Sequence, residues 1–387
     1  MSKEPLSRNR HPNQISNLFL LNSLDIGGSE RKIVRVANAL SSRGRSIGIA
    51  YLNPPEELIG EILPDIATFH LEREGKISRT ALANLKRIIN RHSITRILSV
   101  NLFPALYLAI LRLGGIRFDW TALLNTTDFE NARQAAGMLI FTPSLYLADK
   151  YVFGSRYQAT AWKKRYRLSA EKSSYIHNGI DTAFFTPDSA RVAAKLLRET
   201  CGIPPDSPVI GTVGRMRPEK SQHLILGAAA NLQQAYPDLH IVLVGDGERR
   251  QFLETRAVEL GLSDRTHFLG NLLDVRPALA LMDIFILPST SVETFSNAAL
   301  EAMAIGKPLI LSDISGAREM LEDGVNGFIV QPGNLDELTC RIGILLDDPV
   351  KAGEMGERSR RRAELEFSFQ IMTDNYERLI NMDPETA

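Results

Sequence analysis

The chain has 387 residues, 44% of them hydrophobic and 23% charged, so it is long enough for two packed domains and lacks the composition of a disordered protein. Cys201 and Cys340 are too few for a disulfide framework or a sulfur-rich metal site, and they favour a reducing compartment such as the cytoplasm. The polar N-terminus lacks a secretion signal, and the longest apolar stretch, residues 102–115, is interrupted by Pro104. We therefore expect no membrane-spanning segment.

The formal net charge of zero conceals a difference between the two halves of the chain. Residues 1–190 carry 25 Lys and Arg against 16 Asp and Glu, whereas residues 191–387 carry 20 against 29. The basic first half favours contact with phosphates or an anionic membrane surface, in particular through the run Arg156, Lys163, Lys164, Arg165 and Arg167. A solvated helix face is the alternative interpretation of that run. No recognition motif accompanies the charge, so we expect no nucleic-acid partner.

Strand-like and helix-like segments alternate along the chain. In the first half a helical pattern spans 30–44, and strand-like runs occur at 17–24, 46–52, 94–100, 120–127 and 150–155. In the second half such runs occur at 209–216, 240–247, 266–270, 284–290, 308–313 and 327–333. This alternation predicts an α/β protein with two doubly wound parallel sheets.

The Pro-containing segment 183–207 is the expected linker between the two sheets. It gives domains at 1–187 and 188–366. A last helix within 367–387 is expected to pack back on the first domain.

Ligands of open α/β sheets bind where strands lead into helices, so the loop "LDIGGSER" is the first candidate. Gly27 and Gly28 allow a tight turn and close backbone approach, Ser29 is a candidate N-cap, and Glu30 begins the helix. A simple Gly-Gly turn is the alternative. Neither G-x-G-x-x-G nor G-x-x-x-x-G-K-S/T occurs in the chain, which weighs against hydride transfer and P-loop hydrolysis.

The loop "GTVGRMRPEKSQHLI" opens the second half. Gly214 lets the chain turn off the strand, and Arg215 and Lys220 lie on either side of Pro218, so the two cations can converge on one anion. A guanidinium and an ammonium at a helix start stabilise charge on a nucleotide diphosphate leaving group, a role often left to magnesium. Surface charge near a turn is the alternative, and it suits Arg217 better than this pair.

The segment "LPSTSVETFSNAALEAMAIGKP" carries two glutamates. Ser296 is a candidate N-cap of an Ala-rich helix, whose backbone N–H groups near residues 295–298 would point at a phosphate. Glu293 precedes this cap, near the reacting group, and Glu301 lies about one and a half turns into the helix, where it would accept hydrogen bonds from ribose. From spacing alone, a loop charge and a solvent-facing helix residue explain the pair equally well.

These loops together resemble the retaining glycosyltransferases of family 4 (glycosyl transferases group 1). The resemblance covers most of the chain. It rests on Gly-Gly-x-Glu at 27–30, HNGID at 177–181, Gly-Arg…Glu-Lys at 214–220, VGDG at 244–247, FLG at 268–270, two glutamates with seven residues between them, and GFIVQPG at 327–333. It implies the GT-B fold, in which two Rossmann-like doubly wound parallel-sheet domains face each other across a cleft.

The resemblance also implies an activity and a set of site residues. A hexose would move from a nucleotide-diphosphate donor to a polysaccharide or glycolipid acceptor, with its anomeric configuration kept. The implied catalytic residues are Glu293, Arg215 and Lys220. The implied donor-binding residues are Gly27, Gly28, Gly214, Arg215, Lys220, Phe295, Ser296, Asn297 and Glu301. No cofactor is implied, and the chain has no Asp-x-Asp motif, which agrees with a metal-independent reaction.

The chain departs from the family pattern in two places. Thr294 and Ser296 replace glycines that many relatives have around Phe295. A histidine that relatives often carry after a middle strand of the first domain is also missing, and Asn125 and Asp128 are candidate replacements. His177 is expected to support the turn before the linker.

Two other functions remain open at this stage. One is epimerisation or hydrolysis of a sugar nucleotide on the same fold, and the other is non-catalytic nucleotide-sugar binding. For any of them the expected location is the cytoplasm. The inner face of the cell membrane is the alternative, with peripheral contact through the basic first domain.

Overall fold

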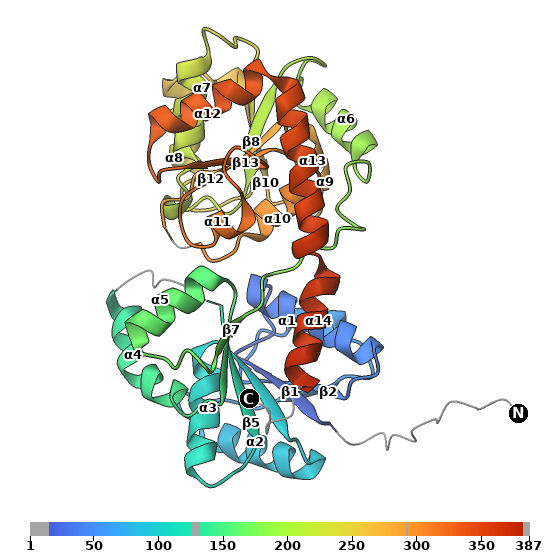
Figure 1. The fold of residues 1–387 in the computed structure, drawn as a ribbon, viewed down its shortest axis with the longest axis vertical. Coiled ribbons are helices and arrows are strands. Elements are labelled where there is room, and N and C mark those ends of the chain that lie inside the picture. Colours follow the sequence, from blue (N-terminus) through green and yellow to red (C-terminus); the bar gives the residue numbers. More distant parts are fainter. Residues whose placement is uncertain (1–14, 126–131, 292, 382–387) are drawn as a thin grey trace, which may run out of the picture.

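The structure is a computed structural model that describes residues 15–125, 132–291 and 293–381. Figure 1 shows two lobes stacked along the long axis of the molecule, and a red helix pair near the C-terminus runs from the second lobe onto the first. Each lobe is a parallel sheet with helices on both faces, which confirms the predicted α/β architecture of two domains.

The first domain is a seven-stranded parallel sheet with the order β3-β2-β1-β4-β5-β6-β7. Its strands are β1 (Asn17–Leu21), β2 (Ile47–Tyr51), β3 (Ala67–His70), β4 (Arg96–Val100), β5 (Asp119–Leu124), β6 (Lys150–Phe153) and β7 (Ser173–Tyr175). Its helices are α1 (Gly28–Ser42), η1 (Glu57–Glu61), α2 (Arg79–His92), α3 (Leu102–Leu113), α4 (Ala132–Leu145) and α5 (Arg156–Tyr166).

Both faces of this sheet are covered. Successive side chains of a strand point to opposite faces, so Leu18 and Leu20 of β1 enter one core cluster and Phe19 and Leu21 enter the other.

The second domain is a six-stranded parallel sheet with the order β10-β9-β8-β11-β12-β13. Its strands are β8 (Val209–Val213), β9 (His240–Val244), β10 (Thr266–Gly270), β11 (Ile284–Leu287), β12 (Leu309–Ser312) and β13 (Gly327–Val330). Its helices are α6 (Arg191–Thr200), η2 (Pro218–Lys220), α7 (His223–Leu232), α8 (Arg250–Glu259), η3 (Ser263–Arg265), α9 (Arg276–Leu281), α10 (Asn297–Ala304), α11 (Ala317–Met320), α12 (Leu335–Asp347) and α13 (Pro349–Glu366).

Every predicted strand-like run contains a strand, and the sequence analysis missed β3 and β7. These two lie at the edges of the first sheet, where partly exposed side chains replace a continuous apolar run. The prediction for the first helix start was wrong: α1 begins at Gly28 with Gly27 as N-cap, and the Ser29 hydroxyl donates to Glu30 Oε2 (2.7 Å) instead of capping.

The segment predicted as a linker at 183–207 contains a helix. This helix, α6, packs against α9, and Ala194 and Ile203 join the core of the second domain. The amphipathic pattern of α6 therefore places it in a domain, and the Pro residues lie before and after it.

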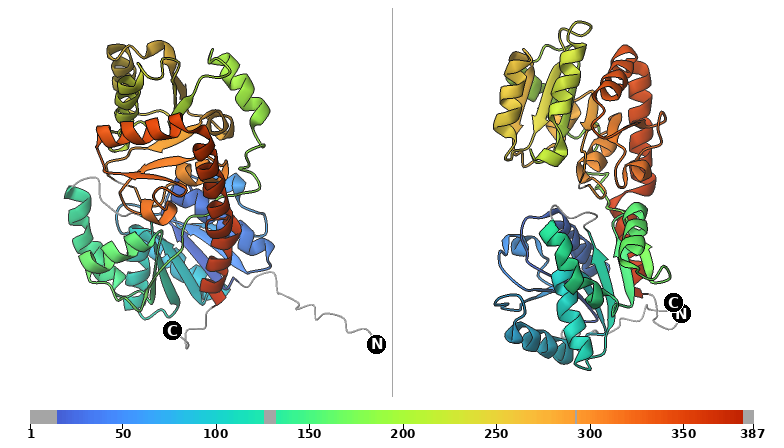
Figure 2. Two further views of the ribbon diagram at one scale, coloured as in Figure 1. Left: turned by 45° about the horizontal axis from the view of Figure 1, so that its top comes forward. Right: turned by 90° about the vertical axis from the view of Figure 1, so that its left-hand side faces the viewer.

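The chain crosses between the domains twice, and the two crossings lie side by side. Ile180 donates its N–H to Phe367 O (2.8 Å), and Phe369 donates to Ile180 O (2.7 Å). A Cβ on Gly179 would lie 2.8 Å from Ser368 O, so the glycine of the HNGID motif permits this close approach. Figure 2 shows both crossings on one side of the molecule, where they form the connection between the lobes.

The last helix, α14 (Phe369–Asn381), lies on the first domain. Its side chains Met372, Tyr376 and Ile380 enter the core cluster that contains β1 and α1. Arg43 of α1 pairs with Glu377 (2.6 Å) and Asp374 (2.8 Å).

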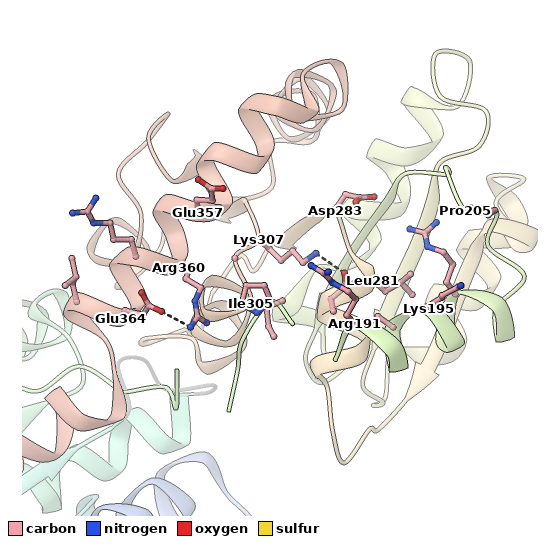
Figure 3. A pocket seen from close by; sticks show the side chains of 17 residues that line it. Arg191, Lys195, Pro205, Leu281, Asp283, Ile305, Lys307, Glu357, Arg360 and Glu364 are labelled. Carbon is pink, nitrogen blue, oxygen red and sulfur yellow. Dashed lines mark hydrogen bonds and ion pairs between the residues drawn. The ribbon is translucent and has the colours of Figure 1, made fainter. Parts of the chain in front are cut away.

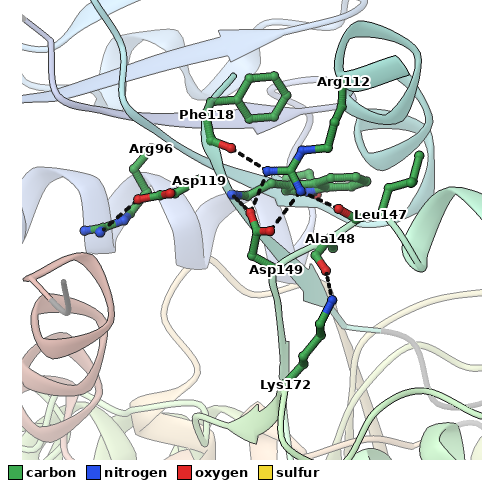
Figure 4. Close-up of polar contacts among 10 residues, drawn as sticks. Arg96, Arg112, Phe118, Asp119, Leu147, Ala148, Asp149 and Lys172 are labelled. Atoms are coloured by element: carbon green, nitrogen blue, oxygen red, sulfur yellow. Dashed lines mark hydrogen bonds and ion pairs between the residues drawn. The ribbon is translucent and has the colours of Figure 1, made fainter. Parts of the chain in front are cut away.

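A polar cluster joins the start of β5 to the start of β6, at the amino-terminal ends of these strands (Figure 4). The Arg112 guanidinium forms a bidentate pair with the Asp149 carboxylate, with distances of 2.9 and 2.6 Å. The same carboxylate accepts the backbone N–H of Trp120 (2.8 Å).

Two imidazoles face each other at the starts of β9 and β10. His240 Nδ1 lies 3.0 Å from His267 Nε2, and the rings are stacked. Burial lowers the pKa of both side chains, and for His240 the neighbouring His267 lowers it further.

This pair predicts a loss of stability in acid. Both folded-state pKa values lie below the ordinary value, so the unfolded chain binds protons more readily and stability falls as pH drops below about 6.5. Between about pH 7.5 and about pH 5.5, His267→Gln should reduce the fall in melting temperature by roughly 2–4 °C relative to wild type. The control is His92→Gln in the first domain. A fall that is the same in wild type and both variants would contradict this role.

Candidate functional site

A pocket of about 760 Å³ lies between the two domains and is lined by both. Asn101 and Asn125, at the ends of β4 and β5, line it from the first domain. Gly214 and Leu287, at the ends of β8 and β11, line it from the second. The carboxyl ends of both parallel sheets therefore meet at this pocket, where ligands of such sheets bind.

The loop after β8 brings two cations to one wall. Backbone bonds fasten this loop to the VGDG segment: Gly214 N–H donates to Val244 O (2.9 Å) and Met216 N–H to Asp246 O (2.9 Å). Arg215 and Lys220 both line the pocket. The Arg215 guanidinium is exposed and makes no hydrogen bond or ion pair within the ranges that the structure describes, so it is available to a ligand.

The turn after β8 does not require glycine at position 214. Added at Gly214, a Cβ would meet nothing within 4 Å. The constrained glycine is Gly245, which has φ +120° and whose Cβ would lie 2.2 Å from Gly214 O.

Lys220 and Glu293 form an ion pair inside the pocket, and the carboxylate also accepts the Ser289 hydroxyl (3.1 Å). Lys220 ends the short helix η2, and Glu293 lies in the loop before α10. The ion pair therefore holds the Lys220 ammonium and the Glu293 carboxylate side by side in the pocket.

The N-terminus of α10 lines the interdomain pocket. Ser296 is its N-cap and accepts the backbone N–H of Ala299 (3.3 Å), which confirms that prediction. The Phe295 side chain is buried and stacks on His177, with ring centroids 4.5 Å apart. Residues 295–298 line the pocket, although the Phe295 ring itself is buried. They lie at the N-terminal end of a helix, which attracts anions.

The structure gives a local role to Thr294 and Ser296, which stand where many relatives have glycine. The Thr294 hydroxyl donates to Asn125 O (3.3 Å) across the domain boundary, and Ser296 caps α10. Both side chains therefore make contacts that a glycine lacks.

His177 and Glu319 connect the domains beside the pocket. His177 Nε2 lies 2.8 Å from Glu319 Oε2, and the same carboxylate accepts the backbone N–H groups of Arg156 (2.8 Å) and Tyr157 (2.7 Å). Burial would raise the pKa of Glu319, but the hydrogen bonds from His177 and the two amides outweigh it and lower the pKa. His177 thus contacts the second domain, away from the pocket lining.

The sequence analysis missed two residues of the site, Lys32 and Asn178. Lys32 Nζ donates to Asn125 Oδ1 (2.7 Å) and Asn178 Oδ1 (3.1 Å). Asn178 Nδ2 in turn donates to Phe295 O (3.1 Å) and Asn297 Oδ1 (3.1 Å). A sequence signal existed for Lys32, because it lies one helical turn after Gly28 and so on the same face of α1.

Gly27 and Glu301 line a smaller adjoining cavity of about 290 Å³, which shares Gly28, Lys32 and Asn178 with the pocket. Burial raises the pKa of Glu301 to about 7, and the charge of Arg35 opposes this shift. Glu301 is therefore a partly buried carboxylate inside a cavity and does not lie on a solvent-facing helix surface. Of the two candidate replacements for the missing histidine, Asn125 lines the pocket, and Asp128 lies outside the described residues.

A larger cavity, of about 1070 Å³, lies elsewhere on the second domain. In Figure 3, Lys307 lies between α13, which carries Arg360 and Glu364, and α6, which carries Arg191. Its innermost cations bind backbone carbonyls: Arg198 Nη1 donates to Pro204 O (2.7 Å), Lys307 Nζ to Ala280 O (2.9 Å), and Arg360 Nη2 to Thr182 O (3.1 Å). These three cations therefore connect segments of the chain.

Within the described residues, no group of three or more His, Cys, Asp and Glu side chains is arranged to hold a metal ion.

Two family models match the chain, one for each domain. The model described as Glycosyltransferase Family 4 matches residues 26–184, and the model described as Glycosyl transferases group 1 matches residues 194–362. The matched ranges contain every residue that lines the interdomain pocket.

Curated relatives and solved structures agree with these matches. The lipopolysaccharide core biosynthesis glycosyltransferase LpsE of Rhizobium meliloti is 33% identical over 47% of this chain and 52% of its own length. A GDP-mannose-dependent phosphatidylinositol monomannoside mannosyltransferase of Mycolicibacterium smegmatis is 31% identical over 56% of this chain and 58% of its own. These alignments span about half the length of the relatives.

A crystal structure of HepE from Anabaena in complex with UDP shares the fold. It has a TM-score of 0.82 and 22% identity, and the match covers 95% of this chain and 99% of that one. With a family model on each domain and one fold throughout, the chain belongs to the group 1, family 4 glycosyltransferases, and its fold is GT-B.

Proposed function

We propose that the protein transfers a hexose from a nucleotide-diphosphate donor to a glycan or lipid-linked acceptor, with retention of anomeric configuration and without a divalent cation. One observation carries this proposal. Arg215, Lys220 and the N-terminus of α10 lie around one interdomain pocket, where they offer a guanidinium, an ammonium and backbone N–H groups to a diphosphate.

The chemistry of the leaving group supports this assignment. As the bond from the sugar to the diphosphate breaks, negative charge grows on the diphosphate oxygens. Cations and helix N–H groups that already surround the diphosphate stabilise that charge without reorganisation of the site. In metal-dependent enzymes a bound metal ion has this role. The Lys220–Glu293 ion pair holds the ammonium in the pocket before the donor arrives, and we assign the Glu293 carboxylate beside it to the donor sugar.

The relatives support a donor and acceptor class for this chain. HepE is crystallised with UDP, and the M. smegmatis relative uses GDP-mannose to modify a phosphatidylinositol mannoside. LpsE acts in lipopolysaccharide core biosynthesis. We extend from these a nucleotide-sugar donor and a glycolipid or polysaccharide acceptor, with UDP as the first nucleotide to test.

The diphosphate and ribose assignments predict two losses of affinity. Lys220→Ala removes a charge-assisted hydrogen bond to the diphosphate, and Glu301→Ala removes an acceptor for ribose hydroxyls. Each should weaken UDP binding, measured by titration calorimetry, by roughly ten- to hundredfold. Arg256→Ala, an exposed change on α8 outside the pocket, is the control. Wild-type affinity in both site variants would refute the assignment.

Glu301 also predicts a pH dependence of binding. Its carboxylate form accepts ribose hydroxyls, and with a pKa of about 7 it becomes protonated as pH falls below 7. UDP affinity should therefore decline from about pH 8 to about pH 6 more steeply in wild type than in Glu301→Gln, which cannot titrate. Equal slopes for the two proteins would contradict the role of Glu301.

The stereochemical course needs a test of its own. Incubation with donor and acceptor, followed by proton NMR of the product, should show the new glycosidic bond with the anomeric configuration of the donor sugar. Free epimerised nucleotide sugar formed without acceptor would instead identify an epimerase, and an inverted linkage would refute retention.

One face of the first domain has features that suit an anionic membrane. No helix among the described residues is both long and apolar enough to cross a bilayer. Helices α4 and α5 lie beside each other (Figure 1), and the Tyr146 hydroxyl donates to Tyr166 O (2.9 Å). Ile140 of α4 (64%) and Tyr146 (49%) are exposed, and Tyr146 reaches the end of α5, whose last turn is basic. Apolar side chains beside Lys and Arg favour binding at a lipid interface.

This face predicts reversible binding to anionic vesicles. In vesicle sedimentation at low salt, wild type should bind phosphatidylglycerol-containing vesicles, and Lys164→Glu with Arg165→Glu should abolish most of that binding. The matched control is Lys86→Glu with Arg87→Glu on α2 of the same domain. Membrane contact through α5 is refuted if wild type stays in the supernatant, or if both charge reversals act alike.

A further inference from the structure

The cavity between α6 and α13 is rich in cations, although the half of the chain that forms it carries an excess of acid. Six Lys and Arg side chains and three Asp and Glu side chains line it. Asp283 and Lys307 line it just before β11 and β12, whereas Leu287 at the other end of β11 lines the interdomain pocket. The cavity therefore lies at the opposite end of the sheet from the residues assigned to the donor. Its cations are Arg191, Lys195, Arg198, Lys307, Arg360 and Arg361.

The carboxylates of this lining leave much of the positive charge without a counter-ion. Glu364 pairs with Arg360 (2.7 Å). Asp283 accepts the backbone N–H of Val209 (2.8 Å) and forms no ion pair with any residue that the structure describes. Glu357 is exposed to solvent and likewise has no ion-pair partner in the described ranges. A lining with six cations and a single ion pair between its described members is predisposed to bind an anion.

Lys307 adds a desolvated ammonium to this lining. Its Nζ donates to Ala280 O (2.9 Å), and no carboxylate of the described residues pairs with it. Burial lowers the pKa of Lys307, the carboxylate of Asp283 opposes this shift, and the charge of Arg198 adds to it. A carbonyl satisfies an N–H group without neutralising its charge, so the ammonium and the Arg198 guanidinium still repel each other. A bound anion would supply the missing counter-charge.

Helix α6 carries three of the cations on one face. Arg191, Lys195 and Arg198 are spaced four and three residues apart, and all three line the cavity. Within the described part of the chain, Lys195 makes no hydrogen bond or ion pair. Arg191 pairs with Asp188 (2.9 Å), but both side chains are 79% exposed, so this pair contributes little. Lys195 and Arg191 are therefore available to a ligand.

The chemistry of the lining suits a phosphorylated small molecule. Guanidinium and ammonium groups bind phosphate oxygens through charge-assisted hydrogen bonds, and one phosphate has enough oxygens to bind several of them. A cavity of about 1070 Å³ has room for a ligand of the size of a sugar phosphate.

We propose that the cavity between α6 and α13 is a second anion site, which binds a phosphorylated small molecule and is separate from the donor pocket. This inference goes beyond the proposed function and does not depend on it. Arg360, on the cavity wall, donates to Thr182 O (3.1 Å) and Phe185 O (2.6 Å), shortly after the chain crosses between the domains at Ile180. A phosphate that bridges α6 and α13 would therefore hold the segment beside the interdomain connection, as an effector does, and would take no part in the transfer itself.

Titration calorimetry with inorganic pyrophosphate, at low salt and without divalent cations, tests the site in the full-length protein. Arg191→Ser with Lys195→Ser removes two exposed cations of the cavity and should weaken its affinity for pyrophosphate by roughly ten- to hundredfold. The matched control, Lys351→Ser with Arg358→Ser, removes the same charge from α13 outside the cavity lining, and its affinity should stay within about threefold of wild type. Both pairs of changes are also made in Lys220→Ala, so that pyrophosphate in the interdomain pocket does not mask the result.

Thermal unfolding provides a second measurement. Without ligand, the α6 variant should melt at the wild-type temperature, because both of the changed side chains are exposed. Pyrophosphate should raise the melting temperature of Lys220→Ala, and the rise should be smaller once the α6 changes are added.

The proposal is overturned if Lys220→Ala binds no pyrophosphate, or if the α6 pair and the α13 pair of changes weaken binding equally. Failure of wild type to bind UDP would refute the proposed function and leave the pyrophosphate result unchanged, so the two failures are distinct.

Discussion

The contact between the N-terminus of α10 and the first domain is the constraint on which the site depends. Asn178 bonds to Phe295 O and Asn297, and Thr294 bonds to Asn125 O. Glu319 of α11 pairs with His177 and accepts the two backbone N–H groups at the start of α5. These contacts place the residues that are expected to bind phosphate and sugar opposite Lys32 and Asn125. Hydrogen bonds of this kind contribute roughly 1 kcal/mol each, so they align the domains without locking them together.

The cations of the pocket contrast with the net charge of the second half of the chain, which supplies them. The half of the chain that forms the second domain carries an excess of acid, yet its β8 loop presents Arg215 and Lys220. Glu293 pairs with Lys220, so the Lys220 ammonium is held in the pocket without being an unpaired charge. Glu301 and Lys32 have pKa values moved toward neutrality by burial. Side chains with such shifted pKa values cost folding free energy, and they are concentrated at functional sites.

The sequence was sufficient for most of the fold, and the second-domain residues that it singled out line one pocket in the structure. Parallel strands buried on both faces form continuous apolar runs, which is why the central strands were predictable and the edge strands β3 and β7 were not. Arg215, Lys220 and Glu293 were singled out by the combination of motifs in their loops, because the spacing of each motif alone left other interpretations open. Lys32 and Asn178 were missed because their significance comes from burial between domains, and a lysine on an amphipathic helix has the pattern of a solvated one.

The central claim is that the cations of the β8 loop and the N-terminus of α10 together bind a diphosphate. A crystal structure of the protein soaked with UDP tests it most directly. The account predicts diphosphate density within hydrogen-bonding distance of Arg215, Lys220 and the backbone of residues 296–298, with the ribose beside Glu301. Density in the cavity between α6 and α13 and none in the pocket, or a bound nucleotide with Arg215 and Lys220 turned toward solvent, would contradict it.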